Sequence, residues 1–264
     1  MEITVASAAA PGGINEDYII TGQDFVVVLD GVTPLPNADY GCHHGVPWLV
    51  RRLGGRLAAG LTEPDIPLTE LLCVAIADAM TGHEHTCDLA NPYSPSTTVS
   101  ILRFGPDSFD YLALADSPIV LQHHGTDPEV ITGYTRPGDA TPDHQRWPLG
   151  RHPEHPYTVA GIHPEAADKA VTGRGDLDKL RRAAVMTDGL SRLVDRHGLY
   201  AWAGLLDLLE ADGRREPLLL CARQTPPCQP ERFAASPMTT PRRPCAFRRR
   251  GVPGRRSAGP AGRP

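Results

Sequence analysis

The sequence is short of several features that would identify its class at once. Lysine occurs only at Lys169 and Lys179, whereas arginine occurs 24 times, which is typical of a GC-rich coding sequence. No stretch approaches the ~20 apolar residues that a membrane-spanning helix needs. The first residues have neither the basic segment nor the apolar core of a signal peptide. We therefore expect a cytoplasmic protein with no membrane partner.

The six cysteines form no C-x-x-C pair. Without an export signal, we expect free thiols in a reducing compartment. The run His83-x-His85-x-Cys87 suggests a zinc cluster, but its spacing fits no standard zinc site. We interpret it as a solvated polar loop.

The net charge of -5 hides a marked asymmetry along the chain. Residues 222–264 carry ten arginines and one acid, Glu231, whereas residues 1–221 carry 16 basic and 30 acidic residues. An acidic domain is unsuited to nucleic acid or to an anionic membrane. We therefore expect no nucleic-acid binding except through the basic tail.

The tail also differs in composition, since proline and glycine make up 13 of residues 222–264. Such a segment cannot bury enough apolar surface to fold. We expect a domain over residues 1–221 and a disordered tail over 222–264. The tail is either an Arg-rich segment that binds acidic partners or, as we prefer, out-of-frame translation of a GC-rich gene that replaces a final strand.

Residues 15–31 are the stretch around which the chain is organised. Two apolar runs flank the polar break 21–24, a pattern that predicts a β-hairpin. Asp17 and Asp30 are equidistant from its centre, so a regular hairpin places both at its open end. Carboxylates meeting there suit Mg²⁺ or Mn²⁺, which prefer oxygen ligands. The alternative is that Asp30-Gly31 simply ends a strand.

The remaining chain alternates between strand and helix patterns in blocks. Helical apolar spacing covers about residues 40–60 and 69–82, and later 190–194 and 200–209. Strands are predicted at 2–6, 97–104, 109–115, 119–122, 169–172 and 183–187, with a long Pro- and His-rich excursion at 133–158. This order predicts an α+β fold with antiparallel sheets.

Three apolar strands stop at an aspartate, namely Asp30, Asp116 and Asp188. Together with Glu16-Asp17, these endings suggest carboxylates that converge along one sheet edge. Converging carboxylates raise each other's pKa unless a cation neutralises them. A two-metal site, which binds phosphate oxygens and activates water, would resolve the repulsion. The alternative is a non-enzymatic β-sandwich in which the aspartates only end strands.

The order of the motifs N-E-D, D-G, S-T-T, A-D-S and T-D-G resembles the metal-dependent PP2C (PPM) family of serine/threonine protein phosphatases, in its compact bacterial form. The matching stretches are 15–31, 94–104, 111–121 and 183–194. The resemblance implies a four-layer α/β/β/α sandwich of two antiparallel sheets flanked by helix pairs. It also implies hydrolysis of phosphoserine and phosphothreonine on a phosphorylated protein substrate by a metal-bridging hydroxide.

The resemblance implies roles for individual residues. Asp30 would bridge two Mn²⁺ or Mg²⁺ ions, and Asp188 would hold one of them; these two are the candidate catalytic residues. Glu16, Asp17 and the Gly31 carbonyl would serve the other ion. Asp116 corresponds to the family's aspartate near a third, weaker metal site.

The sequence departs from the family pattern at three points. The phosphate-binding arginine is replaced by Gly12, which leaves the substrate-binding residue unassigned. The D-G-H histidine, a candidate general acid, is replaced by Val32. His43 or His44 could approach from the next helix, although a solvated histidine at a helix start is the simpler interpretation.

The third departure is the closing strand, whose D-N or D-D-A-T motif carries a further metal ligand in the family and is absent here. Two hypotheses follow. The chain is a metal-dependent protein phosphatase, or it is a pseudophosphatase that keeps the fold as a binding or regulatory module. The missing arginine and aspartate favour the second, and the family's intact members favour the first.

Overall fold

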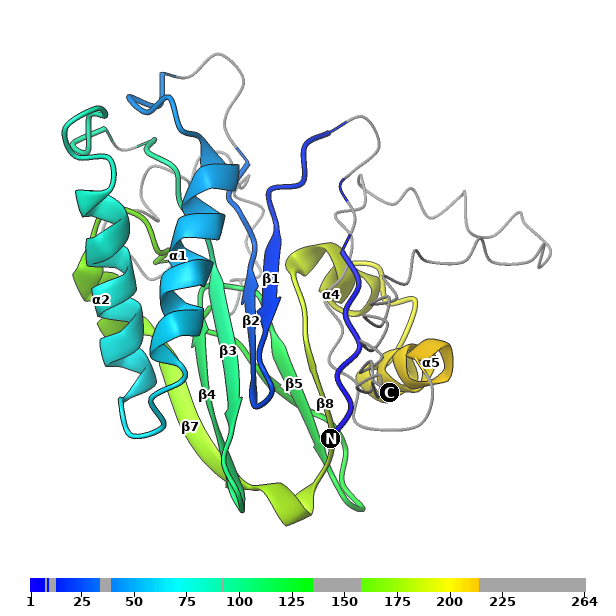
Figure 1. Ribbon diagram of the computed structural model, residues 1–264. Coiled ribbons are helices and arrows are strands. Elements are labelled where there is room, and N and C mark those ends of the chain that lie inside the picture. Colours follow the sequence, from blue (N-terminus) through cyan, green and yellow to red (C-terminus); the bar gives the residue numbers. More distant parts are fainter. Residues whose placement is uncertain (8, 10–12, 34–38, 92, 135–157, 214–264) are drawn as a thin grey trace, which may run out of the picture.

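The computed structural model describes residues 1–7, 9, 13–33, 39–91, 93–134 and 158–213. Two antiparallel sheets lie face to face, one helix pair covers the outer face of the larger sheet, and a second pair covers the smaller sheet (Figure 1). This arrangement confirms the predicted α+β, four-layer sandwich.

The sheets are built from strands that are consecutive or nearly so in the chain. The larger sheet has the order β1-β2-β3-β4-β7, and the smaller has the order β6-β5-β8. Their bounds are β1 Tyr18–Thr21, β2 Phe25–Leu29, β3 Val99–Phe104, β4 Ser108–Leu114, β7 Val171–Asp176, β6 Glu129–Ile131, β5 Ile119–His123 and β8 Leu180–Val185.

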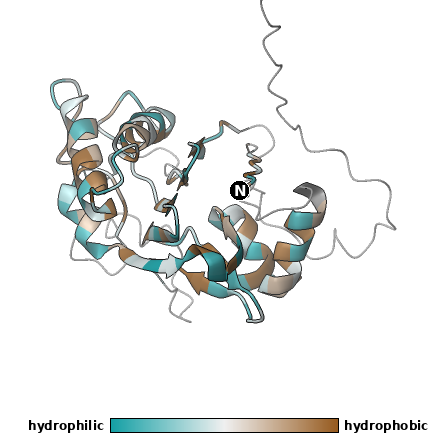
Figure 2. Cartoon of the chain, turned by 60° about the horizontal axis from the view of Figure 1, so that its bottom comes forward, coloured by the Kyte–Doolittle hydropathy of each residue, from teal (hydrophilic) through white to brown (hydrophobic). Residues whose placement is uncertain are grey.

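The helices bury the apolar stripes that the sequence predicts. They are α1 Val46–Gly60, α2 Leu68–Thr81, α4 Asp188–Asp195 and α5 Trp202–Gly213, with short 3₁₀ turns at η1 Pro164–Lys169 and η2 Leu177–Lys179. Hydrophobic and hydrophilic residues share the helices, as Figure 2 shows. No helix in the described part of the chain has the length and apolar character that crossing a membrane requires.

The core has three layers, and β2 explains how they are separated. Val27 and Leu29 of this strand pack with α1 and α2, whereas Val26 and Val28 pack between the two sheets. Because successive side chains of a strand point to opposite faces, a strand buried on both faces must be apolar throughout. The third layer joins the smaller sheet to α4 and α5.

Several local predictions need correction. The strand predicted at 2–6 is absent; this segment is irregular, and Ile3 packs on the layer between the sheets. The strand predicted at 169–172 begins only at Val171, because residues to Lys169 form a 3₁₀ turn. The three-residue strand β6 was too short to predict from alternation.

Some expectations fall where the structure makes no statement. Most of the predicted excursion, the domain boundary at 221 and the tail 222–264 lie outside the described residues. The two hypotheses about the tail therefore stay predictions.

Arg182 connects β8 to α5 through a buried polar network. Its side chain is 3% exposed and donates to Gln122, Asp207 and Glu210 over 2.6–2.7 Å. We expect Arg182→Ala to lower the free energy of unfolding by about 2 kcal/mol, because hydrogen bonds to charged groups are lost. Urea unfolding measures this. The neighbouring Arg181→Ala, which removes an exposed ion pair to Glu210, should change stability by under ~1 kcal/mol. Equal effects would contradict the assignment.

Candidate active site

The open end of the β1–β2 hairpin carries two buried carboxylates. Tyr18 pairs with Leu29 in the register, so Asp17 and Asp30 follow at the same end, as the sequence predicts. They are 5% and 9% exposed, respectively. The hairpin therefore places two acids where water is largely excluded.

Asp30 lies at the centre of the acidic group. Burial raises its pKa well above the usual range, and the carboxylates of Asp188, Asp17 and Asp116 raise it further. The backbone N–H of Asp188 donates to Asp30 Oδ2 over 3.3 Å, which partly offsets this effect. The structure thus brings together the three predicted strand-end aspartates and Asp17.

Hydroxyl groups hold the backbone around Asp30 in place. Thr97 Oγ1 and the Thr98 N–H both donate to the Asp30 carbonyl, over 2.8 and 2.9 Å. Thr98 Oγ1 lies 2.6 Å from Ser117 Oγ, and Ser100 Oγ donates to the Ser117 carbonyl. The S-T-T and A-D-S motifs therefore form one scaffold, a role that the sequence did not reveal.

The residue before Asp116 has an unusual backbone. Ala115 adopts a φ of 69°, which is the left-handed region that a residue with a Cβ rarely enters. The Thr132 hydroxyl donates to the Ala115 carbonyl over 3.0 Å. Strain of this kind costs of order 1–3 kcal/mol and is concentrated at functional sites. It supports Asp116 as part of the site.

Gly31 and Glu16 lie in close contact beside Asp30. A Cβ on Gly31 would lie 2.3 Å from Val46 Cγ1 and 2.5 Å from the Glu16 carbonyl oxygen, so only glycine fits. Burial raises the pKa of the Glu16 carboxyl, and a hydrogen bond from Thr33 counteracts part of that rise. The start of α1 therefore packs directly against the acidic end of the hairpin.

Arg192 is a site residue that sequence reasoning missed. It lies one helical turn after Asp188 on α4, and its guanidinium forms an ion pair with that carboxylate. Burial disfavours its charged form, but Asp188, Asp30 and Asp116 outweigh this and raise its pKa. Arg192 Nε is buried without a hydrogen-bond partner in the described structure. The i, i+4 spacing was the available signal.

The donor set fits a hard divalent cation. Carboxylates from the hairpin, from the turn after β4 and from the start of α4 surround Asp30, whose pKa is raised by burial first and by these neighbouring negative charges second. Oxygen-only donors of this kind suit Mg²⁺ or Mn²⁺. Among the described residues, Arg192 supplies positive charge to this group.

A family model described as protein phosphatase 2C matches residues 6–219. The chain belongs to the protein phosphatase 2C family. The predicted resemblance is thereby confirmed over most of the chain. No curated protein sequence matches it.

Solved structures of bacterial members of the family are also similar. They include the catalytic domain of serine threonine protein phosphatase PstP in complex with two manganese ions (17% identity, TM-score 0.46, 70% of this chain, 76% of that chain). PstP/Ppp of Mycobacterium tuberculosis shows 19% identity, a TM-score of 0.45 and coverage of 70% and 76%. Stp1 from Staphylococcus aureus shows 15% identity and a TM-score of 0.46, and the match covers 71% of this chain and 75% of that chain.

The departures from the family pattern can now be located in part. The Val32 N–H donates to the Ser96 carbonyl over 2.9 Å, and its apolar side chain cannot transfer a proton. His44, considered as a replacement, contacts Cys42, Cys87 and Trp48 instead. Gly12 and any closing strand after residue 213 lie outside the described residues.

Proposed function

We propose that this protein phosphatase 2C chain hydrolyses phosphoserine and phosphothreonine on protein substrates with the help of Mn²⁺ or Mg²⁺. The observation that carries the proposal is the buried Asp30, surrounded by Asp17, Asp116 and Asp188. A group of acids buried together costs free energy unless the protein uses it to bind cations.

The proposed ligands are those that the resemblance to the family implies. Asp30 would contact two ions, Asp188 one of them, and Asp17, Glu16 and the Gly31 carbonyl the other. Asp116 would serve a third, weaker ion. When bound, such ions supply Lewis acidity, lowering the pKa of a water and neutralising phosphate oxygens.

Arg192 gives the site a second function in this proposal. Its guanidinium forms an ion pair with Asp188, and a cation at Asp188 would free it. A free guanidinium can form two parallel hydrogen bonds to a phosphate. Arg192 would thereby supply the contact that is missing at Gly12.

Two observations favour the second candidate function, a pseudophosphatase that binds without hydrolysis. Arg192 already compensates Asp188, and Val32 lacks a titratable group. In that case the fold would serve as a binding or regulatory module, and the ion pair would keep cations out.

The two candidates are separated by an assay of the full chain with phosphothreonine and phosphoserine peptides. We expect phosphate release that depends on millimolar Mn²⁺ and stops with EDTA. Calorimetry on the same sample should detect Mn²⁺ binding. Peptide binding without phosphate release at any Mn²⁺ concentration would replace our proposal with the pseudophosphatase. If the chain neither binds the peptides nor releases phosphate, the remaining interpretation is a non-enzymatic sandwich.

A further inference from the structure

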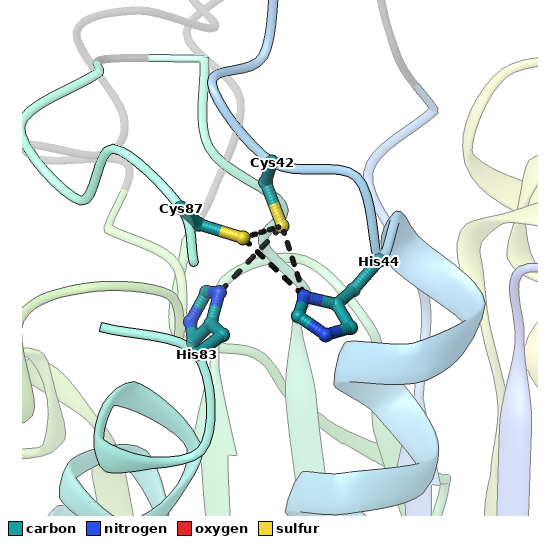
Figure 3. A group of neighbouring side chains, drawn as sticks. All are labelled: Cys42, His44, His83 and Cys87. Atoms are coloured by element: carbon teal, nitrogen blue, oxygen red, sulfur yellow. Dashed lines mark hydrogen bonds between the residues drawn. The ribbon is translucent and has the colours of Figure 1, made fainter. Parts of the chain in front are cut away.

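A group of four sulfur and nitrogen ligands lies outside the acidic site. Cys42 and His44 come from the segment just before α1, and His83 and Cys87 come from the turn after α2 (Figure 3). The ligand atoms of all four side chains lie within 4.8 Å of one another. Residues some 40 positions apart thus point toward one centre.

The distances lie near the edges of a tetrahedral site, although the two sulfur atoms are closer together than those of a zinc site. Zinc binds thiolate at about 2.3 Å and imidazole at about 2.0–2.1 Å, so a tetrahedron places its ligand atoms roughly 3.3–3.8 Å apart. Here Cys42 Sγ lies 3.2 Å from Cys87 Sγ and 3.5 Å from His83 Nδ1, and His44 Nδ1 lies 3.3 Å from Cys87 Sγ. A single ion can contact all four atoms with little rearrangement.

The backbone holds the two segments together independently of these side chains. The backbone N–H of Asp88 donates to the Gly41 carbonyl over 2.7 Å, and the side-chain amide of Asn91 donates to the Asp39 carbonyl over 2.9 Å. Within the turn, the Cys87 N–H donates to the His83 carbonyl, which keeps these two residues one turn apart. Gly41, at a φ of 61°, permits the close approach. The ligands are therefore preorganised.

His83 is the buried member of the group, and its Nδ1 faces Cys42. The residue is 3% exposed, and its Nε2 has no hydrogen-bond partner among the described residues. Thiols are weak hydrogen-bonding groups, so the contacts to sulfur compensate little of the burial cost. Trp48 packs beside both His44 and His83.

We propose that Cys42, His44, His83 and Cys87 bind one Zn²⁺ ion as a structural site. Four protein ligands leave no open position, which is typical of structural and not catalytic zinc. The ion would fasten the start of α1 to the turn after α2. The burial of His83 corrects the interpretation of residues 83–87 as a solvated loop. The ligand spacing is C-x-H with H-x-x-x-C, and the exposed His85 takes no part.

Metal content tests the proposal without reference to phosphatase activity. The full chain is expressed in zinc-supplemented medium and purified in a reducing buffer that contains Mg²⁺. Its metal content is then measured by inductively coupled plasma mass spectrometry. We expect about one Zn²⁺ per chain, falling at least tenfold in Cys42→Ser and in Cys87→Ser. The matched controls are Cys73→Ser, another free cysteine, and His85→Asn; both should retain the ion.

Cobalt substitution keeps the test decisive if a variant fails to fold. Wild-type protein stripped by a chelator and titrated with Co²⁺ should develop thiolate-to-cobalt charge-transfer absorption and the visible bands of tetrahedral cobalt. The acidic site, which has no sulfur, cannot produce the charge-transfer band. The proposal would be overturned if the charge-transfer band did not appear or if both serine variants kept their zinc. A Cys42–Cys87 disulfide in the zinc-supplemented protein would also overturn it.

Discussion

Asp30→Asn should lower Mn²⁺-dependent phosphopeptide hydrolysis by at least about 100-fold and, at the same time, raise the thermal stability of the metal-free protein. Mutating a residue that only hydrogen-bonds to a metal ligand typically lowers metal affinity or activity 10–100-fold, so removing the central ligand itself should lower activity more. The stability gain follows from removing a buried charge that lies among three other carboxylates. The amide oxygen can still accept the hydrogen bond from the Asp188 N–H.

The stability effect has a defined pH dependence. The folded pKa of Asp30 lies above its unfolded value of about 3.9, so the native state binds more protons between these two values. In EDTA, the wild-type protein should therefore lose stability as pH rises from about 4 through the folded pKa. Asp30→Asn should lose less, and Mn²⁺ should restore the wild type at neutral pH.

Differential scanning calorimetry in EDTA measures the gain, which should be a few degrees, since about 1 kcal/mol shifts a domain of this size by roughly 2–4 °C. Asp24→Asn is the matched control, because Asp24 is an exposed acid at the opposite end of the same hairpin. That variant should leave activity and melting temperature unchanged. A lower melting temperature for Asp30→Asn than for the wild type in EDTA would contradict the claim that the buried Asp30 carboxylate destabilises the metal-free protein.

Arg192→Ala should raise the KM for a phosphothreonine peptide by roughly tenfold or more, because a charge-assisted, bidentate hydrogen bond to phosphate is lost. Arg192→Lys should recover part of this loss, since a lysine retains the charge without the planar fork. Steady-state kinetics at saturating Mn²⁺ separates KM from kcat. Arg196→Ala, one turn further on, is the control and should behave as wild type.

The opposite result would identify the pseudophosphatase arrangement. If Arg192 only keeps cations from Asp188, the wild type should release little phosphate, and removal of Arg192 should tighten Mn²⁺ binding and increase hydrolysis. Calorimetric titration of Arg192→Ala with Mn²⁺ measures this directly. Tighter metal binding combined with a gain of activity would contradict our assignment of Arg192 to phosphate.

The sequence predicted the parts of the site that depend on local patterns. The apolar runs on either side of residues 21–24 determine the hairpin, and its register places Asp17 opposite Asp30. Strand-end positions likewise indicated Asp116 and Asp188. Helical stripes predicted α1 and α2 to within a few residues, although the first helix starts at Val46, after Gly45 with its φ of 74°.

The remaining features depend on tertiary contacts. The pairing of Cys42 and His44 with His83 and Cys87 arises only when α1 and α2 pack side by side, so the spacing within either segment fits no standard motif. The role of Arg192 depends on Asp188 starting a helix, which places the guanidinium back over the carboxylate. The irregular course of residues 1–7 shows that an alternating pattern needs a neighbouring strand edge to become a strand.

The hydrogen bond between Thr98 and Ser117 connects segments that lead into different sheets, since Thr98 precedes β3 and Ser117 precedes β5. Asp30 follows the larger sheet, whereas Asp188 follows β8 of the smaller one. The acidic group is therefore divided between the two sheets, and the packing of the sheets against each other fixes the distance between its two halves. A core substitution between the sheets would therefore change the spacing of the carboxylates without touching any of them.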